Sequence, residues 1–255
     1  MDRQMIRRLA ASTLAAVLLA ALPGCATAPA AAPDAVSAAS VRRAPATRYL
    51  EAGQPDLLRF LPPPPAADSP EQARDLAAVL ASQAARTPAE VEAARRDQTV
   101  SVAHFADVLG PAFTAENLPR SFALAGKACR ETSFAVAAAK RHWDRPRPFR
   151  ASAEVRPVIG NVSEGSYPSG HAACGYLWAI LLADLLPAQH DALFARGIAY
   201  GQSRVVGGVH YPTDLAAGRL AAAVVAAQMF ASATFRADLE AARTEMAAAG
   251  LAPTP

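Results

Sequence analysis

Apolar residues recur along most of this chain at the three- and four-residue spacing of an amphipathic α-helix. Runs of Val and Thr with the alternation that is typical of β-strands are scarce. Helices are expected over residues 69–85, 88–96, 100–109, 118–141, 170–186, 188–205, 212–231 and 235–249. The pattern therefore predicts an all-α protein, with a single-domain helical bundle as the most economical fold.

The first 24 residues have the pattern of a secretory signal segment. Three arginines precede an apolar run over residues 9–22, which is short for a membrane span, and small residues follow. The sequence Leu22-Pro23-Gly24-Cys25 resembles a bacterial lipobox. We expect a periplasmic protein that is anchored to the outer membrane if Cys25 is lipidated. The alternative is cleavage near residues 28–32, which would leave the protein free and secreted.

The rest of the chain divides by composition. Residues 25–48 are rich in Ala and Pro and predict a flexible tether, residues 49–250 have the length of one domain, and residues 251–255 form a tail. The formal net charge of +3 is small, and no long Lys/Arg run is present. These features give no support to nucleic-acid binding.

A first group of candidate site residues lies at the start of an expected helix. In Pro168-Ser169-Gly170-His171, Ser169 can cap the helix and Gly170 lets the backbone approach a ligand closely. Free N–H groups at a helix start bind anions. His171 beside them can give or take a proton near neutral pH.

A second group combines a cation with a histidine and a carboxylate. Arg204 precedes a break at Gly207-Gly208, after which His210 and Asp214 are four residues apart. If Pro212 begins a helix, Asp214 can hold one imidazole nitrogen of His210 and leave the other free to attack. The arrangement is that of a nucleophile and the residue that orients it.

The third group contributes more positive charge. Lys140 and Arg147 are separated by six residues, and Pro148 follows. Arg145 is an alternative to Arg147, and only the motif spacing favours Arg147. With Arg204, these side chains would place three positive charges around one anion, an arrangement suited to a phosphate during transfer.

The three motifs, Lys-x6-Arg-Pro, Pro-Ser-Gly-His and Ser-Arg-x5-His-x3-Asp, together resemble the signature of the type 2 phosphatidic acid phosphatase (PAP2) superfamily, which includes vanadium haloperoxidases. Gly165-Ser166-Tyr167 and the segment around Pro62–Pro65 resemble more narrowly the bacterial class A non-specific acid phosphatases. The resemblance covers roughly residues 49–250 and implies a helical domain of the PAP2/haloperoxidase type. It also implies small phosphate monoesters as substrates and a homodimer.

The residues and the resemblance suggest the same mechanism. His210, oriented by Asp214, attacks phosphorus, and His171 protonates the leaving oxygen. The phosphate oxygens are expected to contact Lys140, Arg147, Ser169, Gly170 and Arg204. No metal or other cofactor is expected, although phosphate or vanadate can occupy such a site.

Three other functions remain open: a vanadium-dependent haloperoxidase, a lipid or isoprenoid pyrophosphate phosphatase, and a non-catalytic envelope lipoprotein. The intact motifs argue against the last, and the shortness of the apolar segments argues against a multi-span lipid phosphatase.

Two cysteines, Cys129 and Cys174, follow Cys25. They could pair in an oxidising compartment, but both fall in expected helices whose separation the sequence does not give. Buried free thiols are the expectation.

Overall fold

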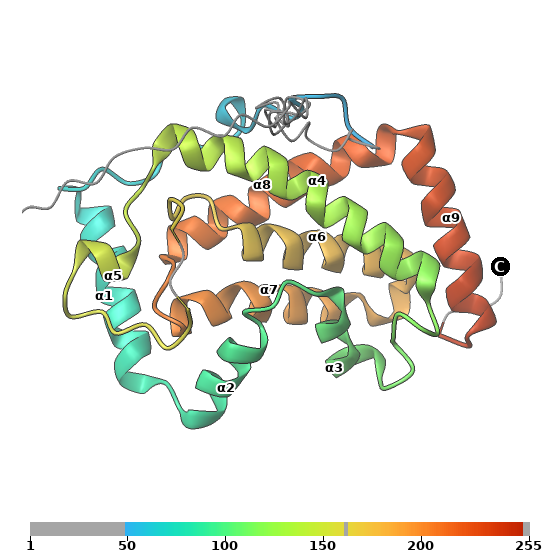
Figure 1. Ribbon diagram of the computed structural model, residues 1–255, viewed down its shortest axis with the longest axis horizontal. Coiled ribbons are helices and arrows are strands. Elements are labelled where there is room, and N and C mark those ends of the chain that lie inside the picture. Colours follow the sequence, from blue (N-terminus) through green and yellow to red (C-terminus); the bar gives the residue numbers. More distant parts are fainter. Residues whose placement is uncertain (1–48, 161–162, 252–255) are drawn as a thin grey trace, which may run out of the picture. The chain divides into compact units, whose positions relative to one another are not determined.

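The computed structural model describes residues 49–160 and 163–251, and within these ranges every regular element is a helix (Figure 1). The α-helices are α1 Pro70–Ala85, α2 Pro88–Arg96, α3 Ala106–Leu109, α4 Pro119–Trp143, α5 Pro148–Ala151, α6 Gly170–Leu185, α7 His190–Val206, α8 Pro212–Ala231 and α9 Ala233–Ala248. Short 3-10 helices span Leu57–Arg59, Val102–Phe105 and Pro187–Gln189. The predicted all-α fold is confirmed. The predicted signal segment, Cys25 and the tether lie outside the described residues.

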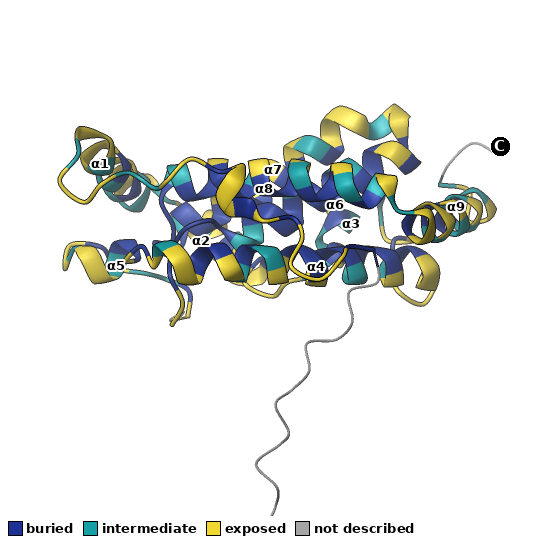
Figure 2. Ribbon diagram, turned by 90° about the horizontal axis from the view of Figure 1, so that it is seen from above, coloured by how far each residue is buried: buried dark blue, intermediate teal, exposed yellow. Residues whose placement is uncertain are grey.

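Helix α6 lies in the centre of this arrangement and packs against α4, α7 and α8 (Figure 1). Its sequence is apolar on all sides, as expected of a helix that is covered all round, and most of its residues are buried (Figure 2). A Cβ built on Gly197 of α7 would lie only 2.7 Å from the Gly175 carbonyl oxygen of α6. Glycine at this position therefore permits the close contact between α6 and α7.

Helix α8 crosses the start of α6 equally closely. A Cβ on Gly218 would lie 2.5 Å from the carbonyl oxygen of Ser169. In the described part of the chain, α8 is also the one helix with the length and mean hydropathy, 1.3, needed to cross a membrane, and half of its apolar window is buried inside the protein. A buried core helix passes the same test of composition.

The end of α4 directs the following segment toward the site. Helix α4 continues to Trp143, two residues beyond its predicted end, and stops where Asp144 adopts a left-handed conformation with φ of 39°. The backbone N–H of Asp144 donates to the carbonyl oxygen of Lys140 over 2.9 Å. The chain then continues without regular structure through Arg145 to Arg147, and α5 begins at Pro148.

The helix that the sequence predicts over residues 100–109 is not continuous. The structure instead has a 3-10 helix, Val102–Phe105, followed by the short α3, which ends before Gly110 with φ of 83°. Ser101 caps the 3-10 helix by accepting from the backbone N–H of Ala103 over 3.1 Å. Val100 is therefore outside any helix.

The expectation of buried free thiols is wrong, because Cys129 of α4 and Cys174 of α6 form a disulfide. The two helices pack side by side, so that the Cα atoms of these residues are 5.1 Å apart, a normal separation for a disulfide. The disulfide joins two helices that contribute residues to the candidate site.

Candidate active site

His210 and Asp214 lie on either side of the start of α8, as the sequence predicts. His210 precedes Pro212, and Asp214 is in the first turn of the helix. The imidazole Nδ1 of His210 lies 3.0 Å from Asp214 Oδ2. Because an ionised carboxylate only accepts hydrogen bonds, Nδ1 carries the proton and Nε2 keeps its lone pair.

Burial keeps this pair in the state that a nucleophile needs. Burial lowers the pKa of His210 well below its ordinary value, although the Asp214 carboxylate acts in the opposite direction. Burial alone would raise the pKa of Asp214, but the hydrogen bond from His210 and the charge of Arg145 lower it to about 2. At neutral pH the imidazole is therefore neutral and the carboxylate is ionised.

Arg145, which the sequence offered as an alternative to Arg147, has its own role on the far side of Asp214. Its Nη1 donates to Asp214 Oδ1 over 2.6 Å, and its Nη2 donates to Asp75 Oδ2 of α1 over 2.7 Å. Its guanidinium carbon lies 4.1 Å from the centre of the Tyr211 ring. All three charged residues of this network are buried.

Ser166 is a further contact of Asp214. Its hydroxyl donates to Asp214 Oδ2, the oxygen that His210 also contacts. In the sequence, Gly165-Ser166-Tyr167 is only a mark of family resemblance, and no role is predicted for Ser166. Its position inside a motif was the one available signal. No sequence signal linked Asp75 to the site, because it is separated from Asp214 by more than half of the described chain.

Two of the predicted cations, Lys140 and Arg147, line the same cavity. Lys140 is buried and its Nζ donates to the carbonyl oxygen of Gly165 over 2.6 Å. Arg147 Nη1 donates to the Val209 carbonyl oxygen over 2.8 Å and lies 3.1 Å from the free Nε2 of His210. Burial, and next to it the charge of Arg147, lowers the pKa of Lys140 to about 8. Burial also lowers the pKa of Arg147 to about 10.

Arg204 stands out because it is buried without enough partners. Its side chain is 2% exposed, yet within residues 49–160 and 163–251 its Nε and Nη1 atoms have no hydrogen-bond acceptor. Burial lowers its pKa to about 10, and the nearby positive charge of Arg147 acts in the same direction. Buried donors on a charged group are costly when they are left unpaired, so this guanidinium indicates a place for an anion.

His171 occupies the first turn of α6, opposite the cations. Its Nε2 lies 3.1 Å from the carbonyl oxygen of Gln98, and its ring stacks on Tyr200 with centroids 5.7 Å apart. Because a carbonyl only accepts, Nε2 is the donor, and in the neutral ring Nδ1 is unprotonated. Burial, and then the charge of Arg204, lowers the pKa of His171 to about 3.

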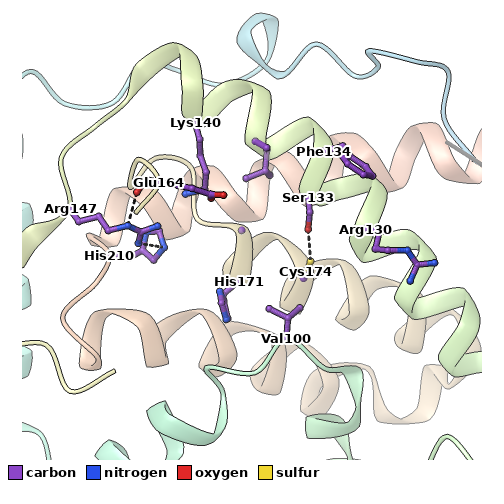
Figure 3. Close-up of a pocket in the computed structure, with 13 residues that line it drawn as sticks. Val100, Arg130, Ser133, Phe134, Lys140, Arg147, Glu164, His171, Cys174 and His210 are labelled. Atoms are coloured by element: carbon purple, nitrogen blue, oxygen red, sulfur yellow. Dashed lines mark hydrogen bonds between the residues drawn. The ribbon is translucent and has the colours of Figure 1, made fainter. Parts of the chain in front are cut away.

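The two remaining predicted residues have different surroundings. Ser169 is fully buried and caps α6, because its Oγ accepts from the backbone N–H of Ala172 over 3.3 Å. Its hydroxyl oxygen is thus engaged in the helix cap. Gly170 lines a cavity of about 420 Å³, a size typical of small-molecule sites, together with Lys140, Arg147, His171 and His210 (Figure 3). Among the described residues, no group of three or more His, Cys, Asp or Glu side chains is placed to bind a metal ion.

Comparison with known proteins identifies the family of the chain. Residues 121–238 match the PAP2 superfamily. The chain is 31% identical to an acid phosphatase of Zymomonas mobilis over 219 residues, which are 83% of this chain and 82% of the relative. It is 33% identical to a non-specific acid phosphatase of Salmonella typhimurium over 196 residues, which are 73% and 78% of the two chains.

A solved structure, that of a bacterial vanadium-dependent iodoperoxidase, aligns with a TM-score of 0.55 at 15% identity over 69% of this chain and 53% of its own. That likeness concerns the helical fold. The curated relatives and the family match concern the enzyme class. The chain is therefore a phosphatase that belongs to the PAP2 superfamily and is similar in sequence to bacterial non-specific acid phosphatases.

Proposed function

We propose that this protein is a secreted or envelope-tethered acid phosphatase that hydrolyses phosphate monoesters through a phosphohistidine intermediate and without a metal ion. The observation that carries the proposal is the unpaired, buried guanidinium of Arg204, on which the charge of Arg147 acts, next to a pocket that Lys140 and Arg147 line. A phosphoryl group can accept hydrogen bonds on three oxygens and neutralises several positive charges at once. No neutral ligand would do both.

In the first half-reaction, the lone pair of His210 Nε2 forms a bond to phosphorus. The bond between phosphorus and the ester oxygen breaks, its electron pair stays on that oxygen, and His171 supplies a proton to the leaving alcohol. Asp214 stabilises the positive charge that develops on the His210 ring, through the hydrogen bond at Nδ1. Arg147, which donates to Nε2 in the structure, would turn its Nη1 to a phosphoryl oxygen.

In the second half-reaction, water attacks the phosphorus and gives a proton to His171. The bond between phosphorus and nitrogen breaks, and its electron pair returns to His210 Nε2. Inorganic phosphate leaves, and both histidines regain their starting states. Two displacements at one phosphorus retain its configuration.

His171 must be protonated to act as an acid, and the bound substrate supplies the means. The positive charge of Arg204 contributes to its low pKa in the protein alone. A phosphoryl dianion placed among these cations cancels their effect and raises the pKa of His171. Binding of the substrate therefore causes His171 to take up the proton that it later gives to the leaving oxygen.

Three fixed cations stabilise the transferring group, and this role is one that a metal ion fills in other phosphatases. The Cys129–Cys174 disulfide supports delivery to an oxidising compartment such as the periplasm. Lipidation of Cys25 and dimer formation stay predictions.

The test is hydrolysis of p-nitrophenyl phosphate by the purified protein in excess chelator, with His210→Ala alongside. We expect turnover by the natural protein alone and an acid-labile phosphoenzyme after rapid quenching. Activity that is lost in chelator and restored by zinc or magnesium would contradict metal independence. Absence of turnover in both folded proteins would favour the haloperoxidase alternative, which peroxide, bromide and vanadate would test.

A further inference from the structure

The pocket extends well beyond the groups that handle phosphate. Helix α4 presents one face to it, formed by Arg130, Ser133, Phe134, Ala137 and Lys140. Positions 130, 133 or 134, 137 and 140 follow one another at intervals of three or four residues, so these side chains form a single stripe along the helix. The stripe has a cation at each end and mainly apolar atoms between. Lys140 belongs to the phosphate end, whereas Arg130 has no part in the chemistry.

Apolar side chains are exposed along the middle of the pocket. Phe134 on α4 is 42% exposed, and Val100 on the facing segment is 50% exposed. Both line the same cavity, from opposite sides (Figure 3). Cys174 lies between them on α6. Large exposed apolar groups that face each other across a cavity are suited to cover an apolar ligand.

Arg130 lies at the end of the pocket away from His210 (Figure 3). Its side chain is exposed, and it forms no hydrogen bond or ion pair with any residue in the described part of the chain. A guanidinium is a planar group with five N–H donors and suits the recognition of carboxylates and other anions. It is therefore a cation in the wall of a pocket, available to a ligand.

The geometry of α4 sets the distance between the two ends. Arg130 and Lys140 are ten residues apart in one continuous helix, which corresponds to a rise of about 15 Å. Both side chains extend into the pocket, so groups bound to them would be on the order of 10–15 Å apart. A small ester such as a triose or glycerol phosphate is too short to reach both.

We propose that the preferred substrates are phosphate monoesters whose alcohol has an extended apolar body and ends in a second anion, such as a carboxylate, that pairs with Arg130. The proposal rests on the proposed function, because it assumes that phosphate is bound at His210. The apolar body lies between Phe134 and Val100. The second anion is recognised by charge, and its distance from phosphorus decides which esters fit.

The experiment uses ω-phosphonooxy-alkanoic acids of increasing chain length, each paired with its neutral primary amide. Phosphate release gives kcat/KM for every acid and amide with the full-length protein. We expect the ratio of acid to amide to be near one for the shortest chains and to reach about three- to fivefold at the matching length, the size of an exposed ion pair. High salt should reduce this ratio.

Arg130→Gln should bring the ratio to one at every length. Because the ratio is measured within each protein, a general loss of activity does not affect it. Arg120 is an exposed residue at the N-terminal end of α4, and it does not line the pocket. Arg120→Gln removes the same charge and should keep the preference. The proposal is overturned if the natural protein shows equal acid and amide rates at all lengths, if it prefers the amides, or if Arg130→Gln keeps the preference. Turnover of p-nitrophenyl phosphate by the natural protein separates these outcomes from failure of the proposed function.

Discussion

Arg145 Nη1 donates to Asp214 Oδ1 over 2.6 Å, while His210 contacts the other oxygen of the same carboxylate over 3.0 Å. Asp214 is thus held from two sides, by the residue that it orients and by a cation that does not line the pocket. Arg145 is held in turn by Asp75 of α1. The orientation of the nucleophile therefore depends on a helix that contributes nothing to the pocket itself.

Replacing Arg145 should reduce turnover more than substrate binding. In Arg145→Lys the shorter, single-point cation cannot contact Asp75 and Asp214 together, so Asp214 and His210 lose their fixed positions. We expect kcat to fall on the order of 100-fold with a small change in KM. Steady-state kinetics check this, with Arg147→Gln as the contrast, because loss of a cation in the pocket wall should change KM as well.

Asp75→Asn should have a smaller effect than Arg145→Lys, because it retains the shape of the side chain. It should lower kcat in the same direction and to a smaller extent. Breaking a buried ion pair costs about 3–5 kcal/mol of unfolding free energy, so thermal unfolding must show that each variant is folded at the assay temperature. An unchanged kcat in a folded Arg145→Lys protein would show that Arg145 has no part in positioning the nucleophile.

His171→Ala should discriminate between leaving groups. An aryl ester such as p-nitrophenyl phosphate releases a stable anion and needs little protonation, whereas an alkyl ester needs a proton on the leaving oxygen. We expect the alkyl ester to lose about 10²- to 10⁴-fold in kcat/KM and the aryl ester much less. Parallel measurements on the two esters test this. Equal losses would remove His171 from the role of general acid.

Anion binding should be accompanied by proton uptake. The pKa of His171 is about 3 in the protein alone, below its ordinary value of 6.5, and a bound dianion among the cations raises it. Sulfate is a suitable probe because it does not titrate above about pH 3. At about pH 5 we expect uptake of up to one proton for each sulfate bound.

Calorimetry in two buffers with different ionisation enthalpies measures that uptake. His171→Ala should bind sulfate without it. If uptake persisted in the variant, the proton would belong to His210 or another group. If sulfate did not bind at all, the anion site around Arg204 would itself be in question.

The disulfide should stabilise the fold substantially. It closes a loop between residues 45 positions apart, for which chain entropy gives about 4 kcal/mol of unfolding free energy. The Cys129→Ala/Cys174→Ala double variant should therefore unfold at lower urea concentration than the natural protein. Coincident unfolding curves, with the natural protein kept oxidised, would contradict a stabilising role.

Motif spacing and periodicity predicted what depends on neighbours in sequence. His210 and Asp214 meet because they are four residues apart at a helix start, and the helices follow from the apolar pattern. The contact of Arg145 with Asp75 depends instead on how α1 packs against the site, and the Cys129–Cys174 bond depends on the register of α4 against α6. Tertiary packing sets both relationships, and no local pattern carries them.

The Cys129–Cys174 bond also makes one side of the pocket more rigid than the other. It joins α4, which carries Phe134 and Lys140, to α6, which carries His171. Val100 on the facing side belongs to no helix, and non-covalent contacts alone hold its segment in place. A bulky ligand would therefore be accommodated by outward movement of the Val100 side, while the cross-linked side keeps the spacing between acid and cation constant.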